Sequence, residues 1–167
     1  SGAVTSTYNA GTGVWSASGA IADVNTLLAG LTFTPAANFN SNFTIATSVS
    51  DGVAAAITGS KAMTGTPVND APTATNLSAA ETYVEDTALN LTDIVVSDID
   101  SATVTATLTL SNIAAGSLNT ATSGAVTSTY NAGTGVWSAS GAIADVNALL
   151  AGLTFTPAAN FNSNFTI

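Results

Sequence analysis

The sequence predicts an all-β protein built from tandem copies of one β-sandwich domain, with one short helix in each copy. Residues 1–45 return as residues 123–167, an offset of 122 residues, and only Thr26 against Ala148 differs among the 45 positions. Several segments also alternate apolar and polar residues with a period of two, which is typical of strands with one buried face. A β-solenoid would repeat every roughly 6 to 30 residues, so the 122-residue period favours a sandwich domain of ordinary size.

The clearest strand is expected over Ala102–Leu110, where Val104, Ala106 and Leu108 alternate with threonines. Glycine-containing turn signals separate it from the other candidate strands. These are expected over Val4–Tyr8, Val14–Ala17, Leu31–Pro35, Asn42–Ser50 (with Phe43, Ile45 and Val49 inward), Val53–Thr58, Ala88–Leu91 and Ile94–Val96.

One segment breaks the β pattern. Residues 21–29 place apolar side chains at helical spacing, with Asp23 in the first turn and Gly30 after the last. The spacing predicts a short α-helix or 3₁₀ turn here and in the second copy. Asp23 and its counterpart Asp145 are expected to interact with the helix dipole rather than with a ligand.

A proline-flanked stretch, Thr66–Thr73, predicts a domain boundary. Its two prolines enclose Asn-Asp and favour an extended connection. Residues 1–66 are then the C-terminal part of one repeat, residues 67–72 a linker, and residues 73–167 the next repeat without its last strands, the equivalents of Ala46–Gly65.

The composition excludes several classes of function. One Lys and no Arg or His stand against ten acids, giving a net charge of −9. Such a chain cannot neutralise phosphates, so nucleic acid is not expected as a partner, and no apolar run reaches the roughly 20 residues that span a membrane. Without His or Cys there is no Ser-His or Cys-His pair, so no enzyme is expected. The absence of Cys in a Thr-rich acidic β protein suggests an exported protein stabilised by metal rather than by disulfides.

The acids are concentrated in one stretch. Six of them lie within residues 81–100, and Asp70 lies just upstream. Carboxylates this dense repel one another unless they are solvated, protonated or bridged, and a hard divalent cation commonly bridges them. The alternative is that these Asp and Asn side chains cap turns.

Four segments together resemble the cadherin-like repeats of very large bacterial surface adhesins. They are PVNDAPT (67–73), VEDTALNL (84–91), VSDIDSATVTATL (96–108) and SGAIADVNALLAGLTFTPAANFN (140–162), with FTIATSVSDG (43–52) from the preceding copy. The resemblance implies an immunoglobulin-like or cadherin-like Greek-key sandwich. It also implies a secreted, calcium-binding array on the cell surface or outside the cell.

The resemblance also implies metal ligands. Asn69 and Asp70 match the Asn-Asp of the cadherin linker motif, and Asp98 and Asp100 match its Asp-x-Asp pair. Asp51 resembles the acid that closes the site at the N-terminal end of its own domain. Glu85 and Asp86 resemble an early acidic residue that serves the far end of the second domain.

The sequence departs from the family's pattern at two places. Pro67 stands where the linker motif begins with Asp, and no acid lies between Asp23 and Asp51. One weakly held calcium ion is therefore expected in place of three. Extracellular modules commonly bind calcium with dissociation constants of about 10⁻⁴ to 10⁻³ M.

Three functions follow as hypotheses. The first is a structural spacer or stalk of a calcium-stiffened adhesin or biofilm-matrix protein, whose partners are neighbouring repeats, other copies, or a cell-surface glycan or protein. The second is a subunit of an extracellular filament assembled by β-strand donation between copies, because the second repeat lacks strands that the first contains. The third is a carbohydrate-binding module, although Trp15 and Trp137 are expected to pack rather than to stack on sugars.

Overall fold

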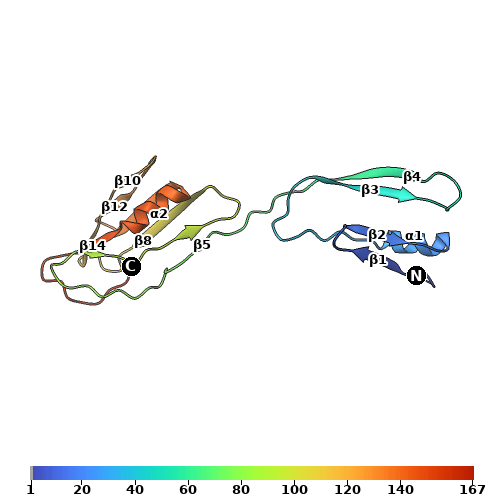
Figure 1. Cartoon of the computed structure of the whole chain (residues 1–167). Helices are drawn as coiled ribbons and strands as arrows, with labels where there is room; N and C mark the ends of the chain where they lie inside the picture. Colours follow the sequence, from blue (N-terminus) through green and yellow to red (C-terminus); the bar gives the residue numbers. More distant parts are fainter. Residues whose placement is uncertain (1) are drawn as a thin grey trace. The chain divides into compact units, whose positions relative to one another are not determined.

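The computed structural model describes residues 2–167; Ser1, where the first expected domain begins, lies outside the described residues. These residues form several small antiparallel sheets and two helices (Figure 1). It divides into two compact units, Ser1–Val68 and Asn69–Ile167, which we call unit 1 and unit 2. Neither helix is long and apolar enough to cross a membrane.

Unit 1 consists of two hairpins and a helix. β1 (Ser6–Asn9) pairs with β2 (Val14–Ala17), and β3 (Phe43–Val49) pairs with β4 (Ile57–Met63), both antiparallel. α1 (Ile21–Ala29) occupies the range expected for a helix. The apolar pattern of these residues therefore selects helix as predicted.

Unit 2 contains two three-stranded antiparallel sheets, two two-stranded sheets and a helix. The three-stranded sheets have the orders β12-β13-β8 and β6-β14-β9, and the short pairs are β5-β7 and β10-β11. The elements are β5 (Thr73–Ala74), β6 (Leu89–Asn90), β7 (Val96–Ser97), β8 (Thr103–Thr109), β9 (Gly116–Leu118), β10 (Thr122–Ser123), β11 (Val126–Thr127), β12 (Thr129–Asn131), β13 (Val136–Ala142), α2 (Ile143–Ala151) and β14 (Thr154–Pro157).

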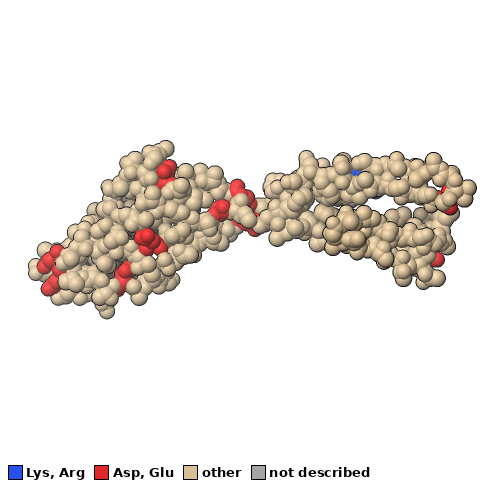
Figure 2. All heavy atoms as spheres, in the orientation of Figure 1, with Lys and Arg blue, Asp and Glu red and all other residues tan. Residues whose placement is uncertain are grey.

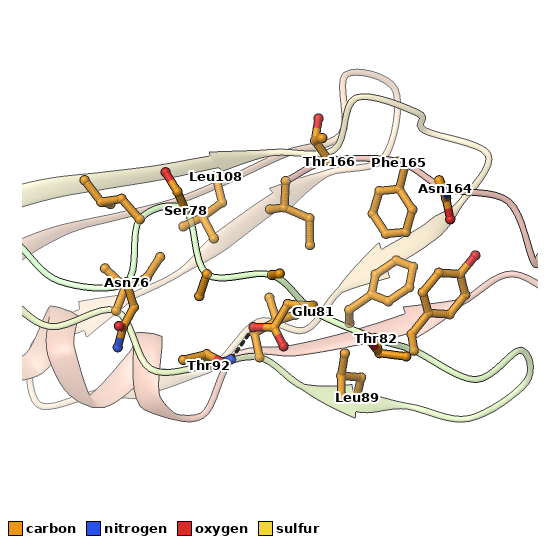
Figure 3. Close-up of a pocket in the computed structure, with 18 of the residues that line it drawn as sticks. Asn76, Ser78, Glu81, Thr82, Leu89, Thr92, Leu108, Asn164, Phe165 and Thr166 are labelled. Carbon is orange, nitrogen blue, oxygen red and sulfur yellow. Dashed lines mark hydrogen bonds between the residues drawn. The ribbon is translucent and has the colours of Figure 1, made fainter.

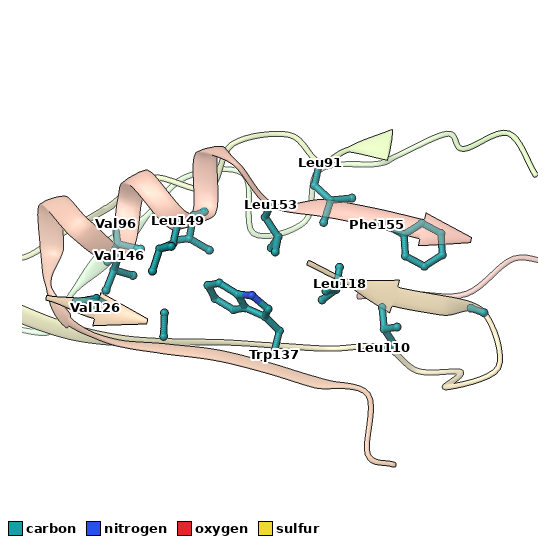
Figure 4. Close-up of a cluster of buried hydrophobic side chains, with 13 residues drawn as sticks. Leu91, Val96, Leu110, Leu118, Val126, Trp137, Val146, Leu149, Leu153 and Phe155 are labelled. Carbon is teal, nitrogen blue, oxygen red and sulfur yellow. The ribbon is translucent and has the colours of Figure 1, made fainter. Parts of the chain in front are cut away.

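The core of unit 2 lies between α2 and the strands (Figure 4). Its largest fully buried side chains are Trp137, Phe155, Leu150 and Val146. The indole Nε1 of Trp137 donates to the carbonyl of Asn119 at 3.0 Å, so its one polar atom is satisfied. The expectation that this tryptophan packs in the protein is confirmed.

The same residue types are much less buried in unit 1. Among its described residues, Val4 alone is a buried hydrophobic residue. Phe33 is 49 % exposed, whereas its counterpart in the second copy, Phe155, is 1 % exposed. Leu28 is 45 % exposed, whereas its counterpart Leu150 is 2 % exposed. Because the sequences around these pairs are nearly identical, the difference in burial comes from the rest of each unit and not from the local sequence.

Two strand positions and one strand orientation expected for unit 1 are wrong. Residues 31–35 form no strand, whereas their counterparts in unit 2 form β14. The strand expected over Val53–Thr58 begins later, as β4, and residues 50–56 connect it to β3. Ile45 and Val49 do not point into a core, since they are 37 % and 65 % exposed. Phe43, on the same face of β3, packs against the rings of Phe33 and Phe39.

Candidate functional site

The residues after the domain boundary are held against the Asp98–Asp100 loop by a short sheet. β5 pairs antiparallel with β7, with Thr73 opposite Ser97 and Ala74 opposite Val96. The two side-chain hydroxyls of Thr73 and Ser97 are 2.8 Å apart. An antiparallel register that begins this way brings Asp70 opposite Asp100.

The expected approach of these two residues takes the form of a hydrogen bond. The backbone N–H of Asp70 donates to Oδ2 of Asp100 at 2.8 Å. Beside it, the amide of Asn69 donates to the carbonyl of Asp70 at 2.7 Å. The linker motif and the Asp-x-Asp motif therefore meet at one edge of unit 2.

Asp98 folds back onto its own loop. Its Oδ1 accepts the N–H of Ser101 at 2.8 Å and the N–H of Asp100 at 3.0 Å. These backbone donors, that of Ser101 first, hold the pKa of Asp98 below its usual value. Asp98 is therefore an anion at neutral pH, and the turn is the kind that a capping Asp makes.

Asp51 makes the same turn in unit 1. Its Oδ1 accepts the N–H groups of Val53 and Ala54, each at 2.9 Å, and they lower its pKa. Asp51 and Asp98 thus share one local geometry. In each, Oδ1 accepts the backbone N–H groups of the residues two and three positions later in the chain.

Glu85 and Asp86 belong to a different turn of unit 2. The turn is closed by the N–H of Thr87 on the carbonyl of Val84 at 3.2 Å, and Asp86 has a φ of 62°. Oδ1 of Asp86 accepts the N–H of Asn160 at 2.9 Å, which ties the turn to the loop after β14. The structure gives Asp86 a local role, and Glu85 is exposed.

The donor chemistry of the Asn69–Asp70 and Asp98–Asp100 group fits a hard cation. All the side-chain acceptors there are carboxylate or amide oxygens, which calcium prefers. Within residues 2–167, however, no three Asp, Glu, His or Cys side chains converge into a group that could hold a metal ion. Calcium takes about six to eight oxygens, so backbone carbonyls and water would have to complete the shell of an ion held at Asp98 and Asp100.

The charge distribution distinguishes the two units. Eight of the ten acids lie in unit 2, whereas Lys61, the chain's one basic residue, lies in unit 1. Figure 2 shows the acidic side chains of unit 2 in several separate groups on its surface. Unit 2 therefore carries a net negative charge, which attracts cations and repels anions.

One residue that supports the site was not identified from the sequence. Asn147 on α2 accepts the N–H of Val96 through Oδ1 and donates Nδ2 to the carbonyl of Val96, both at 2.9 Å. It thereby fixes β7 two residues before Asp98. The only signal in the sequence was an Asn at the same position of both helical repeats, and its copy Asn25 is exposed.

Comparison with known proteins adds no assignment, because no family model, curated protein or solved structure matches this chain.

Proposed function

We propose that this chain is a structural spacer of an extracellular tandem-repeat protein, built from cadherin-like sandwich repeats that calcium stiffens at their junctions. One observation carries the proposal: the backbone of Asp70, at the start of unit 2, is bonded to the carboxylate of Asp100. An ion held at this loop would act on the residues that connect one repeat to the next.

Near-identity of the two copies supports the spacer role. An array that grows by duplication gains length without new chemistry, and consecutive copies need only fold and connect. The abundance of acids and the single basic residue also suit an extracellular protein in a medium rich in divalent cations. Adhesion or a biofilm matrix would use such reach and spacing.

The first test is thermal unfolding followed by circular dichroism, after removal of metal with EDTA and again with calcium added. For a dissociation constant of about 10⁻⁴ to 10⁻³ M, 10 mM calcium stabilises the binding form by roughly 1.4 to 2.7 kcal/mol. For a domain of unit 2's size, we expect the Tm to rise by at least roughly 5 °C.

A matched pair of variants locates the ion. Asp100→Asn removes one charge from the loop and should abolish most of the calcium-induced shift in Tm. Asp93→Asn removes the same charge from an exposed acid outside the predicted site and should retain the shift. A parent protein whose Tm does not respond to calcium would exclude the calcium site, and equal loss in both variants would exclude this location.

The spacer role has its own measurement. Small-angle scattering from a protein of several consecutive repeats, with calcium and with EDTA, reports the stiffness of the junctions. We expect a longer maximum dimension with calcium. Equal dimensions in both conditions would contradict calcium stiffening even if an ion binds.

A further inference from the structure

Unit 2 is built from two parts of the chain, and one of them is the repeated sequence. We call residues 69–122 the framework, residues 123–167 the segment, and residues 1–45 the first copy of the segment. Each three-stranded sheet takes strands from both parts. β12 and β13 of the segment join β8 of the framework, and β14 of the segment lies between β6 and β9 of the framework. The fold of unit 2 therefore depends on contacts between framework and segment.

Backbone hydrogen bonds form the larger share of these contacts. β13 pairs with β8 over seven residue pairs, from Val136 opposite Thr109 to Ala142 opposite Thr103. At the end of this ladder the N–H of Ile143 donates to the carbonyl of Ala102 at 3.1 Å. These bonds fix the register of the segment on the framework.

Side chains from both parts complete the core. Trp137 of the segment donates to the carbonyl of Asn119, and Asn147 of the segment bonds both backbone groups of Val96. The buried cluster in Figure 4 likewise combines framework and segment residues. Figure 3 shows Leu108 of the framework and Phe165 of the segment lining the same pocket.

The first copy carries the same residue at each of these positions. The counterparts of Trp137, Asn147 and Phe165 are Trp15, Asn25 and Phe43. The one difference among the 45 positions is Thr26 in place of Ala148. Ala148 is exposed, and the hydroxyl of Thr26 bonds within its own helix, to the carbonyl of Ala22 at 2.9 Å. The framework therefore has no means of distinguishing the first copy from its own segment.

The first copy also has the local shape of the segment. In β1–β2, Tyr8 lies opposite Trp15, as Tyr130 lies opposite Trp137 in β12–β13. The glycines before the two helices, Gly19 and Gly141, have φ values of 153° and 152°. α1 and α2 each contain nine residues. A partner that is already in its bound conformation loses less conformational entropy when it binds.

We propose that the framework accepts the first copy from a second chain in place of its own segment, so that chains of this protein exchange equivalent parts. Exchange of identical elements is a low-cost route to association, and repeat proteins are prone to it. Each framework–segment contact that is broken is formed again, so neither the segment nor the first copy has to be unpaired beforehand.

The partner is thus another chain of the same protein. Because the copies are equivalent, the exchange is not restricted to one register, and two arrays can join at any repeat. Such joining would hold neighbouring molecules together without a separate binding domain. This inference goes beyond the spacer function and needs no metal.

A disulfide across the β8–β13 ladder can report the exchange. Thr105 and Ser140 lie opposite one another, with their hydroxyl oxygens 2.7 Å apart. Opposite residues of an antiparallel pair have Cα atoms about 4.5–5.5 Å apart, within the range of roughly 4.4–6.8 Å that a disulfide spans. The counterpart of Ser140 is Ser18, and the chain contains no cysteine that would compete. A link between positions 105 and 18 therefore marks an exchanged part.

The experiment divides the two cysteines between two chains. A Thr105→Cys chain and a Ser18→Cys chain are unfolded together in urea, refolded in EDTA under reducing conditions, and then oxidised. We expect a dimer that peptide mass spectrometry shows to be joined between positions 105 and 18. A single chain with Thr105→Cys and Ser140→Cys gives the reference yield for the same ladder position.

A matched cysteine measures links made by random collision. Thr7 is exposed like Ser18, but its counterpart Thr129 lies on β12, which β13 separates from β8. Exchange should join the Thr105→Cys chain to the Ser18→Cys chain several-fold more than to a Thr7→Cys chain. Equal yields would overturn the proposal.

Weakening one part gives a second, independent readout. Leu150→Ala in the Thr105→Cys chain removes a buried side chain from its own segment only, so it should raise the yield of the link to position 18. Leu28→Ala in the Ser18→Cys chain weakens the incoming part and should lower that yield. A yield that neither substitution changes would contradict exchange. Because EDTA is present throughout, neither result depends on the calcium site.

Discussion

The contact between Asn147 and Val96 offers the sharpest test of how α2 positions the candidate site. The amide of Asn147 satisfies both backbone groups of Val96, each at 2.9 Å, and Val96 is only 7 % exposed. Asn147→Ala removes both partners at once and leaves the N–H and carbonyl of Val96 without a protein partner. The change should therefore destabilise unit 2 and loosen β7.

The expected cost can be worked from these two bonds. Each bond contributes about 0.5–1.5 kcal/mol, and leaving the buried backbone groups of Val96 unpaired adds to the loss, so we expect these effects to cost about 2 kcal/mol. Alanine has a higher helix propensity than asparagine, which offsets up to roughly 0.7 kcal/mol. The second copy of the sequence supplies the control: Asn25→Ala on α1 has the same propensity gain, and Asn25 is exposed.

The assay is urea unfolding followed by the fluorescence of Trp137, in a Trp15→Phe background so that unit 2 alone is observed. With m near 2 kcal/mol/M, a net loss of about 1.3 to 2 kcal/mol lowers the midpoint by roughly 0.7 to 1 M urea. Asn25→Ala, followed through Trp15 in a Trp137→Phe background, should leave the midpoint unchanged or raise it slightly. Equal effects of the two substitutions would refute the positioning role of Asn147. Hydrogen exchange of the Val96 amide that is as slow in Asn147→Ala as in the parent would refute it too.

Two further predictions use the same unfolding assay. Leu150→Ala should lower the free energy of unfolding by about 2–5 kcal/mol because Leu150 is 2 % exposed. Leu28 is 45 % exposed, so Leu28→Ala should lower it by about 1 kcal/mol or less. Similar losses would contradict the different packing of the two helices. The pKa of Asp98 is lower in the folded chain than in the unfolded chain, so the unfolded chain binds the proton first as the pH falls. The unfolding free energy of unit 2 should therefore decline below about pH 4, and less steeply in Asp98→Asn, which does not titrate; identical slopes would show that Asp98 contributes nothing.

Local patterns predicted the helices and the clearest strand well. α1 and α2 cover the expected nine-residue segments, and β8 lies within the expected Ala102–Leu110. In both cases the periodic placement of apolar residues decides the structure within one segment. The sandwich arrangement of the sheets, by contrast, depends on contacts distant in sequence and stays a prediction.

The candidate site was predictable only as far as its turn chemistry. An Asp two residues before another polar residue commonly accepts N–H groups from its own loop, and Asp98 does so. The contact between Asp70 and Asp100 follows once β5 and β7 pair, but two strands of two residues each carry almost no sequence signal. Asn147 was missed because a polar residue within a helix can equally well be exposed to solvent or be hydrogen-bonded to a distant part of the chain.

The two copies of residues 1–45 show which structures local sequence can specify alone. The helix forms in both units because its hydrogen bonds close within the segment. The strand β14 forms only in unit 2, because its two partners, β6 and β9, come from residues 89–118, which precede the second copy. A strand thus needs an edge, whereas a helix does not.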